Sequence, residues 1–192
     1  MRHLLCIISI AILCVATPAA AQWTGFYAGG SIGQLHAKSA CDGVSGPGVS
    51  CDDKDTAWRV LAGFQMSPYF AVEAGYTDLG EVRASGPGGT VSAEATAMEI
   101  LGIGTLPVAD KLSVYGKFGL YRGEVDGRAN TFTVTGTASE SNTDLTYGFG
   151  MRFDITRQAA IRFEWQRYPD IGGPETGEDD VDVIGIGAIV KF

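Results

Sequence analysis

The sequence has few basic residues, few histidines and few cysteines. It contains 14 Lys and Arg residues against 22 Asp and Glu residues, for a net charge of −8 at pH 7. Nucleic-acid binding needs a cationic surface opposite the phosphates, so this balance argues against a nucleic-acid partner. The two histidines are His3 and His36, which leaves little of the side chain that enzymes use most often for proton transfer.

Only one long apolar run occurs, at residues 4–15. It follows the positive start Met1-Arg2-His3 and precedes Ala19-Ala20-Ala21. A positive start, an apolar core and a site of small residues are the three parts of a secretory signal peptide. The run is shorter than the roughly 20 apolar residues that a membrane-spanning helix needs. The sequence therefore predicts a signal peptide at residues 1–21 and a mature domain at residues 22–192.

Two of the four cysteines belong to the predicted signal peptide, which leaves Cys41 and Cys51 as a single possible pair. An exported protein reaches an oxidising compartment, where a disulfide is the usual state of such a pair. The bridge would contribute about 2–3 kcal/mol, largely by restricting the unfolded chain. A zinc site is the alternative, but two thiols with one nearby histidine fall short of the usual four ligands.

Apolar residues recur with a period of two throughout the predicted mature domain. In residues 147–154, tyrosine, phenylalanine and methionine alternate with glycine, arginine and aspartate, and residues 161–166 repeat the pattern. This is the period of a β-strand with one apolar face. Eight such segments occur, at residues 23–36, 55–66, 69–83, 92–106, 111–124, 142–154, 159–168 and 181–192.

The connections between these segments alternate in length. Those at 67–68, 107–110 and 155–158 are tight turns, whereas those at 37–54, 84–91, 125–141 and 169–180 are longer and polar. This alternation describes an up-and-down meander. The strands have about the 9–11 residues that a tilted strand needs to cross a bilayer. The predicted fold class is all-β, an eight-stranded antiparallel up-and-down transmembrane β-barrel, with its short turns in the periplasm.

Charged residues within the strands lie on the face opposite the apolar one. They are Glu73, Glu99, Lys117, Arg152, Arg162 and Glu164. The interior of an eight-stranded barrel is narrow and filled by side chains, so charges of both signs can pair there. In lipid, one charge near the midplane would cost roughly 2–4 kcal/mol. We therefore expect the apolar face to point outward and the charges to form a network in the lumen.

Aromatic residues on the outward face support this orientation, because they fall at two levels. Near the turn end they are Phe26, Phe70, Phe153 and Phe192, and toward the loop end they are Trp58, Tyr76, Tyr147 and Trp165. Two aromatic bands are typical of the two interfaces of a membrane. Because strand edges must be paired in lipid, the last strand is expected to pair with the first.

Several segments resemble the OmpA-type family of outer-membrane barrels. Residues 63–80 (GFQMSPYFAVEAGYTDLG) are similar to its second-to-third-strand region, 25–33 (GFYAGGSIG) to its first strand, and 160–168 (AIRFEWQRY) to its seventh. The resemblance covers essentially the whole mature chain. It implies location in the cell outer membrane, contact with its lipid and lipopolysaccharide, and recognition of the C-terminal Phe192 by the barrel-assembly machinery. Many members continue into a peptidoglycan-binding domain, and we expect this chain to be the barrel alone.

The family's lumen carries a ring of paired charges, and the resemblance places Glu73 and Arg162 on matching positions. Arg152 falls where the prototype has an acid, and Ile103 falls where it has a lysine, so the interior is related but rewired. From the residues, Glu73 is expected to pair with Arg162 or Arg152, and Lys117 with Glu164 or Glu99. Glu73→Ala should lower barrel stability by a few kcal/mol, which a urea midpoint would measure.

No enzyme, cofactor or resident metal is predicted. His36 lies near the outer rim, where some barrels modify lipid A, but no convergent serine and acid accompany it. The acidic loops have oxygens that suit calcium or magnesium, although such runs usually stay solvated. The expected role is structural or surface-interacting, with any ligand bound by the outer loops. A small pore and an adhesin are the alternatives. Bilayer conductance tests the first, and trimming residues 37–54 tests the second.

Overall fold

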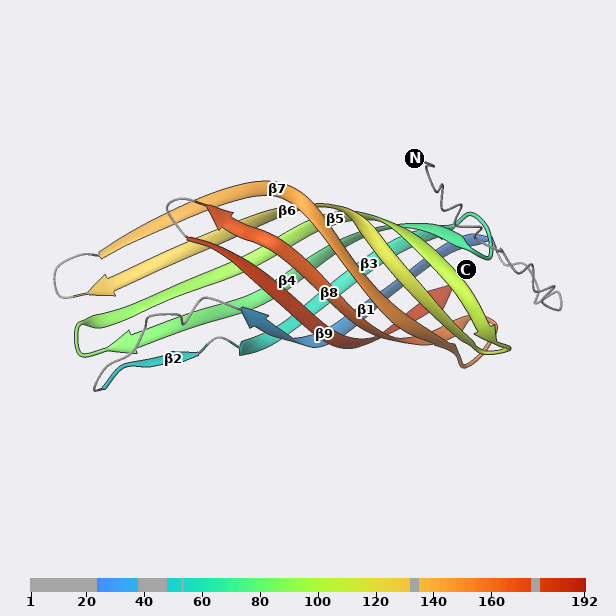
Figure 1. The fold of residues 1–192 in the computed structure, drawn as a ribbon, viewed down its shortest axis with the longest axis horizontal. Coiled ribbons are helices and arrows are strands. Elements are labelled where there is room, and N and C mark those ends of the chain that lie inside the picture. Colours follow the sequence, from blue (N-terminus) through green and yellow to red (C-terminus); the bar gives the residue numbers. More distant parts are fainter. Residues whose placement is uncertain (1–23, 38–47, 53, 132–134, 174–176) are drawn as a thin grey trace, which may run out of the picture.

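The computed structural model describes residues 24–37, 48–52, 54–131, 135–173 and 177–192. These form nine β-strands and no helix (Figure 1). The strands are β1 (Gly25–Ala37), β2 (Ser50–Asp52), β3 (Lys54–Gln65), β4 (Phe70–Gly86), β5 (Gly89–Ala109), β6 (Leu112–Thr131), β7 (Thr135–Asp154), β8 (Ala159–Gly173) and β9 (Gly177–Lys191). Within this part of the chain there is no helix of the length and hydrophobicity needed to span a bilayer.

Eight of the strands close into an antiparallel barrel. The order around the wall is β4-β3-β1-β9-β8-β7-β6-β5, and β5 pairs back onto β4. The ladder between the first and last strands runs from Tyr27 opposite Lys191 to Ala37 opposite Val181. The closure that the sequence predicted is therefore confirmed. Short β2 lies outside this ring and pairs with β4 at residues 83–85.

The tight connections gather at one end of the barrel, here called the turn end, and the long ones at the other, the loop end (Figure 1). Side chains stabilise these turns. The hydroxyl of Ser67 accepts a hydrogen bond from the backbone N–H of Phe70 at 3.1 Å. Thr156 does the same for the N–H of Ala159 at 2.9 Å. Such local bonds are the reason that serine and threonine favour turns.

Three of the segments that sequence analysis assigned to loops are largely strand. In one of them, 169–180, β8 continues to Gly173 and β9 begins at Gly177, with Ile171 opposite Asp179. β4 and β5 stay paired from Phe70 opposite Gly104 up to Gly86 opposite Gly89, and β6 pairs with β7 up to Asn130 opposite Thr135. The predicted loops at 84–91 and 125–141 are thus long hairpins with short tips.

Beyond the bilayer the outward face turns polar, while the inward face keeps small or apolar residues such as Val82, Ala93 and Val125. The alternation is therefore reversed relative to the lipid-facing part, and the Ser, Thr and Gly content resembles a loop.

The wall is less regular where β7 meets β8. Their ladder ends at Tyr147 opposite Arg167, and β8 then bulges, with Asp170 at a φ of 51°. Side chains bridge the two strands above this point. Thr146 donates its hydroxyl to the carbonyl oxygen of Arg167 at 2.7 Å, and Asn142 donates to that of Asp170. Side-chain donors thus satisfy carbonyls that the interrupted ladder leaves.

Candidate functional site

Six charged side chains meet in the middle of the barrel lumen. Each lies on the inward face of its strand, where alternation buries every second residue. They are Arg59 on β3, Glu73 on β4, Glu99 on β5, Lys117 on β6, and Arg162 and Glu164 on β8. Their side chains are between 0% and 8% exposed. Three cations face three carboxylates, so the formal charge of this central network balances.

Arg59 contacts all three carboxylates, and sequence analysis did not single it out. Its Nε lies 2.5 Å from Oε1 of Glu99, and its two Nη atoms lie 3.3 Å from Glu73 and 3.4 Å from Glu164. The signal was present, because Ala57, Arg59 and Leu61 are alternate residues of one predicted strand. The guanidinium can serve three partners because its five donors fan out in one plane.

The other pairs connect β4, β6 and β8. Arg162 Nη1 lies 2.5 Å from Oε1 of Glu73, and Lys117 Nζ lies 3.0 Å from Oε2 of Glu164. Both contacts are among the alternatives that sequence analysis left open. Glu99 lies near Arg59 rather than beside Lys117. The network as a functional site stays a prediction, and what the geometry provides is a set of links across the lumen between distant strands.

Neutral side chains hold the three carboxylates in place. Tyr27 donates its hydroxyl to Glu73 at 2.7 Å, and Tyr115 donates to Glu164 at 2.9 Å. Glu99 accepts from the amide of Gln166 at 2.6 Å and from the hydroxyl of Tyr168 at 3.0 Å. Buried charges are tolerated when hydrogen bonds satisfy their remaining lone pairs. These contacts do so for Oε2 of Glu99, whereas its Oε1 accepts no hydrogen bond from the described residues and lies in ion-pair contact with Arg59.

Arg152 is the predicted network member that the structure does not bring to Glu73. It lies near the turn end, where its Nε is 3.6 Å from Oδ2 of Asp154. Asp154 also takes Lys191, at 2.5 Å. Arg152 lies opposite Arg162 across β7 and β8, but Arg162 is the one that contacts Glu73, and Arg152 instead lies beside Asp154 of its own strand.

Apolar layers enclose the central network on both sides. The layer toward the loop end consists of Leu35, Ala37, Ala57, Leu79, Ala97, Tyr121, Val125, Tyr168, Ile171 and Val181. The layer toward the turn end consists of Tyr27, Leu61, Ala71, Leu101, Ile103, Tyr115, Ala160 and Ile189. A cavity beside Arg59 and Glu164 measures about 20 Å³, which is room for about one water molecule. The lumen is therefore packed in three layers, apolar, charged and apolar.

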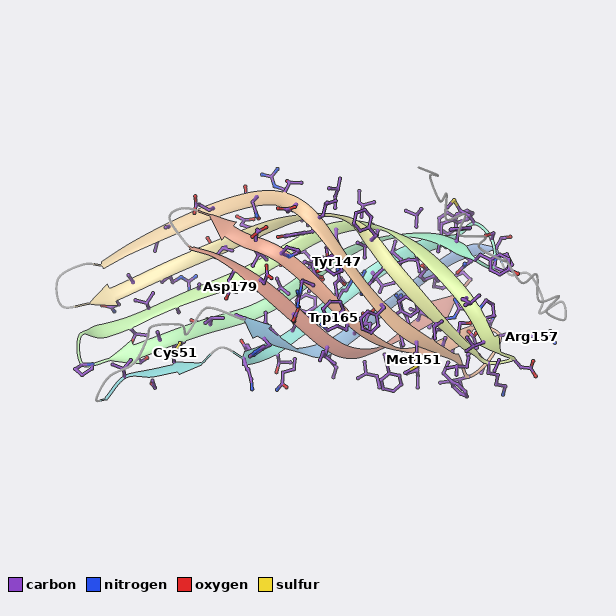
Figure 2. All side chains as sticks on the ribbon, viewed as in Figure 1. Cys51, Tyr147, Met151, Arg157, Trp165 and Asp179 are labelled. Atoms are coloured by element: carbon purple, nitrogen blue, oxygen red, sulfur yellow. The ribbon has the colours of Figure 1, made fainter. Side chains whose placement is uncertain are left out.

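The outer wall is apolar, and the predicted interface aromatics lie on it. Phe26, Trp58, Phe70, Tyr147, Phe153 and Phe192 are between 41% and 76% exposed, while Tyr76 and Trp165 are half-buried. Trp58 packs on Tyr76 at 5.7 Å and Tyr147 on Trp165 at 5.9 Å, measured between ring centroids. Figure 2 shows Tyr147 and Trp165 on neighbouring strands. Their anchoring role, and recognition of Phe192 during assembly, stay predictions.

The remaining predicted residues lie toward the loop end. Cys51 on β2 is disulfide-bonded, but Cys41 lies outside the described residues, so their pairing stays a prediction. The predicted signal peptide also lies outside them. His36 is exposed on the outward face of β1, opposite Lys54 and Asp182. Nowhere in the described part of the chain do three His, Cys, Asp or Glu side chains form a metal site.

Beyond the wall, β4, β5 and β6 carry alternating rows of charge. Glu81, Glu94 and Asp126 lie opposite one another across the three strands and form an acidic row. The next outward row toward the loop end contains Arg83 on β4 and Arg128 on β6. A hydrogen bond from Ser92, and then one from Arg83, lower the pKa of Glu81 below its usual value. The side chains of Glu81 and Arg83 in these rows are 35% and 58% exposed.

The comparisons with known proteins agree with this architecture. The sequence model of the outer membrane protein beta-barrel domain family matches residues 6–192. Outer membrane protein A of Klebsiella pneumoniae is 26% identical over 87% of the chain and 51% of its own length. The chain thus spans about half the length of the relatives it matches. Neisserial surface protein A has a TM-score of 0.62 at 14% identity, covering 89% of this chain and 99% of that one.

A third likeness is to Ail, the attachment invasion locus protein of Yersinia pestis. It has a TM-score of 0.51 at 15% identity and covers 88% of this chain and 99% of that one. The chain belongs to the outer membrane protein beta-barrel family. It is a β-barrel of the bacterial outer membrane.

Proposed function

We propose that this family member is a closed, non-conducting barrel that anchors an extracellular sheet for surface interactions. The observation that carries the proposal is the three-layer filling of the lumen. Ions crossing it would have to pass two apolar layers and the ion pairs between them. Hydrophobic constrictions block ion passage because they do not stay wet.

The outer half of the barrel supports the interaction part of the proposal. β4 to β7 are 17 to 21 residues long, whereas a tilted strand needs only about 9–11 to cross a bilayer. The extra length extends β4 to β7 beyond the other strands of the barrel at the loop end (Figure 1), and the charged rows lie on this part of β4, β5 and β6. Rigid strands that present exposed side chains are a suitable base for recognition. The likeness to the attachment invasion locus protein is compatible with adhesion, which remains a form of this role.

Planar-bilayer recording tests the closed state. The purified protein is inserted into bilayers, and the inserted fraction is measured separately by heat-modifiable gel migration of the same preparation. We expect barrels that are folded and inserted but give no stable conductance steps. Reproducible steps that scale with the folded fraction would contradict the proposal and favour the alternative, a narrow pore.

The same proposal assigns the chain no catalytic role. His36 is on the outward face, opposite Asp182 and Lys54 and with no serine facing it on either neighbouring strand. A nucleophile and a base must lie within hydrogen-bond reach for covalent catalysis. A lipid A-modifying activity that disappears in His36→Ala would overturn this assignment.

A further inference from the structure

An apolar groove runs over the outer wall of β3 to β6 and ends at an arginine. Its volume is about 920 Å³. Its outward lining consists of Val60, Ala62, Ala74, Tyr76, Met98, Ile100, Leu120, Arg122 and Thr143. Ala62 and Ala74 lie opposite each other on β3 and β4, and their short side chains make the floor of the groove.

Arg122 stands at the loop-end side of this groove. It lies in one cross-strand row with Tyr76 and Met98, and four residues beyond Phe118, which is opposite Tyr147 of the outer aromatic band. Four residues of a tilted strand rise about 10 Å. The guanidinium therefore lies past the aromatic band, at the depth where lipid phosphates lie, while the groove below it lies at the depth of acyl chains.

The charge of Arg122 is not neutralised within the described part of the chain. Its hydrogen-bond contact there is the hydroxyl of Ser141, at 3.2 Å, and no carboxylate lies within ion-pair distance. Arg167 makes the comparison clear. It is also outward and beside Tyr147, but Asp182 binds it with two contacts, at 2.7 Å and 2.9 Å. Of these two outward arginines, Arg122 is the one that can bind an external anion.

We infer that this groove is a binding site for a phosphorylated, multiply acylated glycolipid of the outer leaflet, that is, for lipid A. Arg122 would bind a phosphate, for which a planar guanidinium is well suited, and an acyl chain would lie over Ala62 and Ala74. The outer leaflet follows from the loop-end position of Arg122, since long loops face outside. This inference rests on the proposed orientation and envelope role, and it names the lipid partner.

The test uses the full barrel, purified in detergent and stripped of lipid. Native mass spectrometry measures its affinity for bisphosphorylated lipid A, for the same lipid A without phosphates, and for phosphatidylglycerol. The variants are Arg122→Gln, which removes the cation, and Ala74→Leu, which fills the groove from the lipid side. Arg128→Gln, on the same strand and equally outward but beyond the membrane, is the matched control for loss of charge.

We expect Arg122→Gln to weaken binding of bisphosphorylated lipid A by about tenfold, with little effect on the dephosphorylated form. Ala74→Leu should weaken both forms, and Arg128→Gln neither. Unchanged binding in Arg122→Gln would overturn the inference, and equal affinity for phosphatidylglycerol would assign the groove to phospholipid and overturn lipid A. Neither outcome affects the closed-barrel proposal, because conductance through the lumen does not involve an outward arginine.

Discussion

The inner and outer faces of a single strand follow opposite rules in this protein. On β3, Arg59 is 4% exposed, while its neighbours Trp58 and Val60 are 42% and 50% exposed. The inward residue joins an ion-pair network, and the outward ones contact hydrocarbon. The difference shows that the buried fraction of a position does not by itself determine whether its side chain is polar or apolar. The wall excludes charge because lipid cannot solvate it, and the lumen accepts charge because partners from other strands converge on it.

The largest effect should come from removing the centre of the inner face. Arg59→Ala leaves three buried carboxylates with two cations, so we expect the free energy of unfolding to fall by about 3–5 kcal/mol. Because Arg59 contacts all three carboxylates, the loss should at least equal that of Glu73→Ala. Urea unfolding in vesicles, followed by tryptophan fluorescence, measures both. An unchanged midpoint would contradict the network as a source of stability.

A smaller effect should distinguish glycines on the two faces. Gly102-Ile103-Gly104 and Gly185-Ile186-Gly187 look alike in sequence but lie on opposite faces of the wall. On the inward face, a Cβ at Gly187 would lie 2.7 Å from the carbonyl oxygen of Gly30, but at outward Gly104 it would meet nothing within 4 Å. Close packing therefore requires the glycine at 187 but not the one at 104.

Alanine substitutions convert this difference into a measurement. Gly187→Ala must displace backbone of β1 and should cost about 1–3 kcal/mol in unfolding free energy. Gly104→Ala is the matched control, because it makes the same glycine-to-alanine change on the outward face. It should change the free energy of unfolding by no more than about 0.5 kcal/mol. Equal losses in the two variants would show that the two faces do not differ in packing as their geometry indicates.

The smallest effect concerns the turn-end ion pair. Lys191→Ala removes the 2.5 Å contact with Asp154, whose side chain is 23% exposed and also has Arg152 nearby. Because water and a second cation can still compensate Asp154, we expect a loss of only about 1 kcal/mol. The same urea assay measures it. A loss as large as that of Arg59→Ala would remove the distinction between the central network and the turn end.

Much of the fold could be predicted because it depends on local patterns. The alternation in residues 147–154 and 161–166 identified the strands and their faces, and the closure of the last strand on the first followed from the need to pair every edge in lipid. The prediction failed where the alternation reverses. In β6 and β7 beyond the bilayer, mostly small or apolar residues face inward and polar residues face outward, so the lipid-facing pattern is not continued and a paired hairpin looks like a loop.

The candidate site was predicted only in part. Glu73, Arg162, Lys117 and Glu164 were expected inside and lie there, but Arg59 was overlooked, and Arg152, offered as an alternative partner of Glu73, lies beside Asp154. A period of two assigns a residue to a face, but it contains no information about height. Partners on strands that are far apart in sequence meet only at equal height in the lumen, which depends on strand tilt and register together.

The sequence by itself determined that alternate residues face opposite solvents, that eight segments are strands, and that the apolar face points outward. The strands and their faces follow from alternation along each segment, and the orientation follows from the cost of placing the charged face in lipid. Only the tertiary structure decided that Arg59 joins three carboxylates, that apolar layers enclose them, and that Arg122 ends an outer groove. Each of these depends on the register of several strands around a closed barrel, and closure couples all of those registers at once.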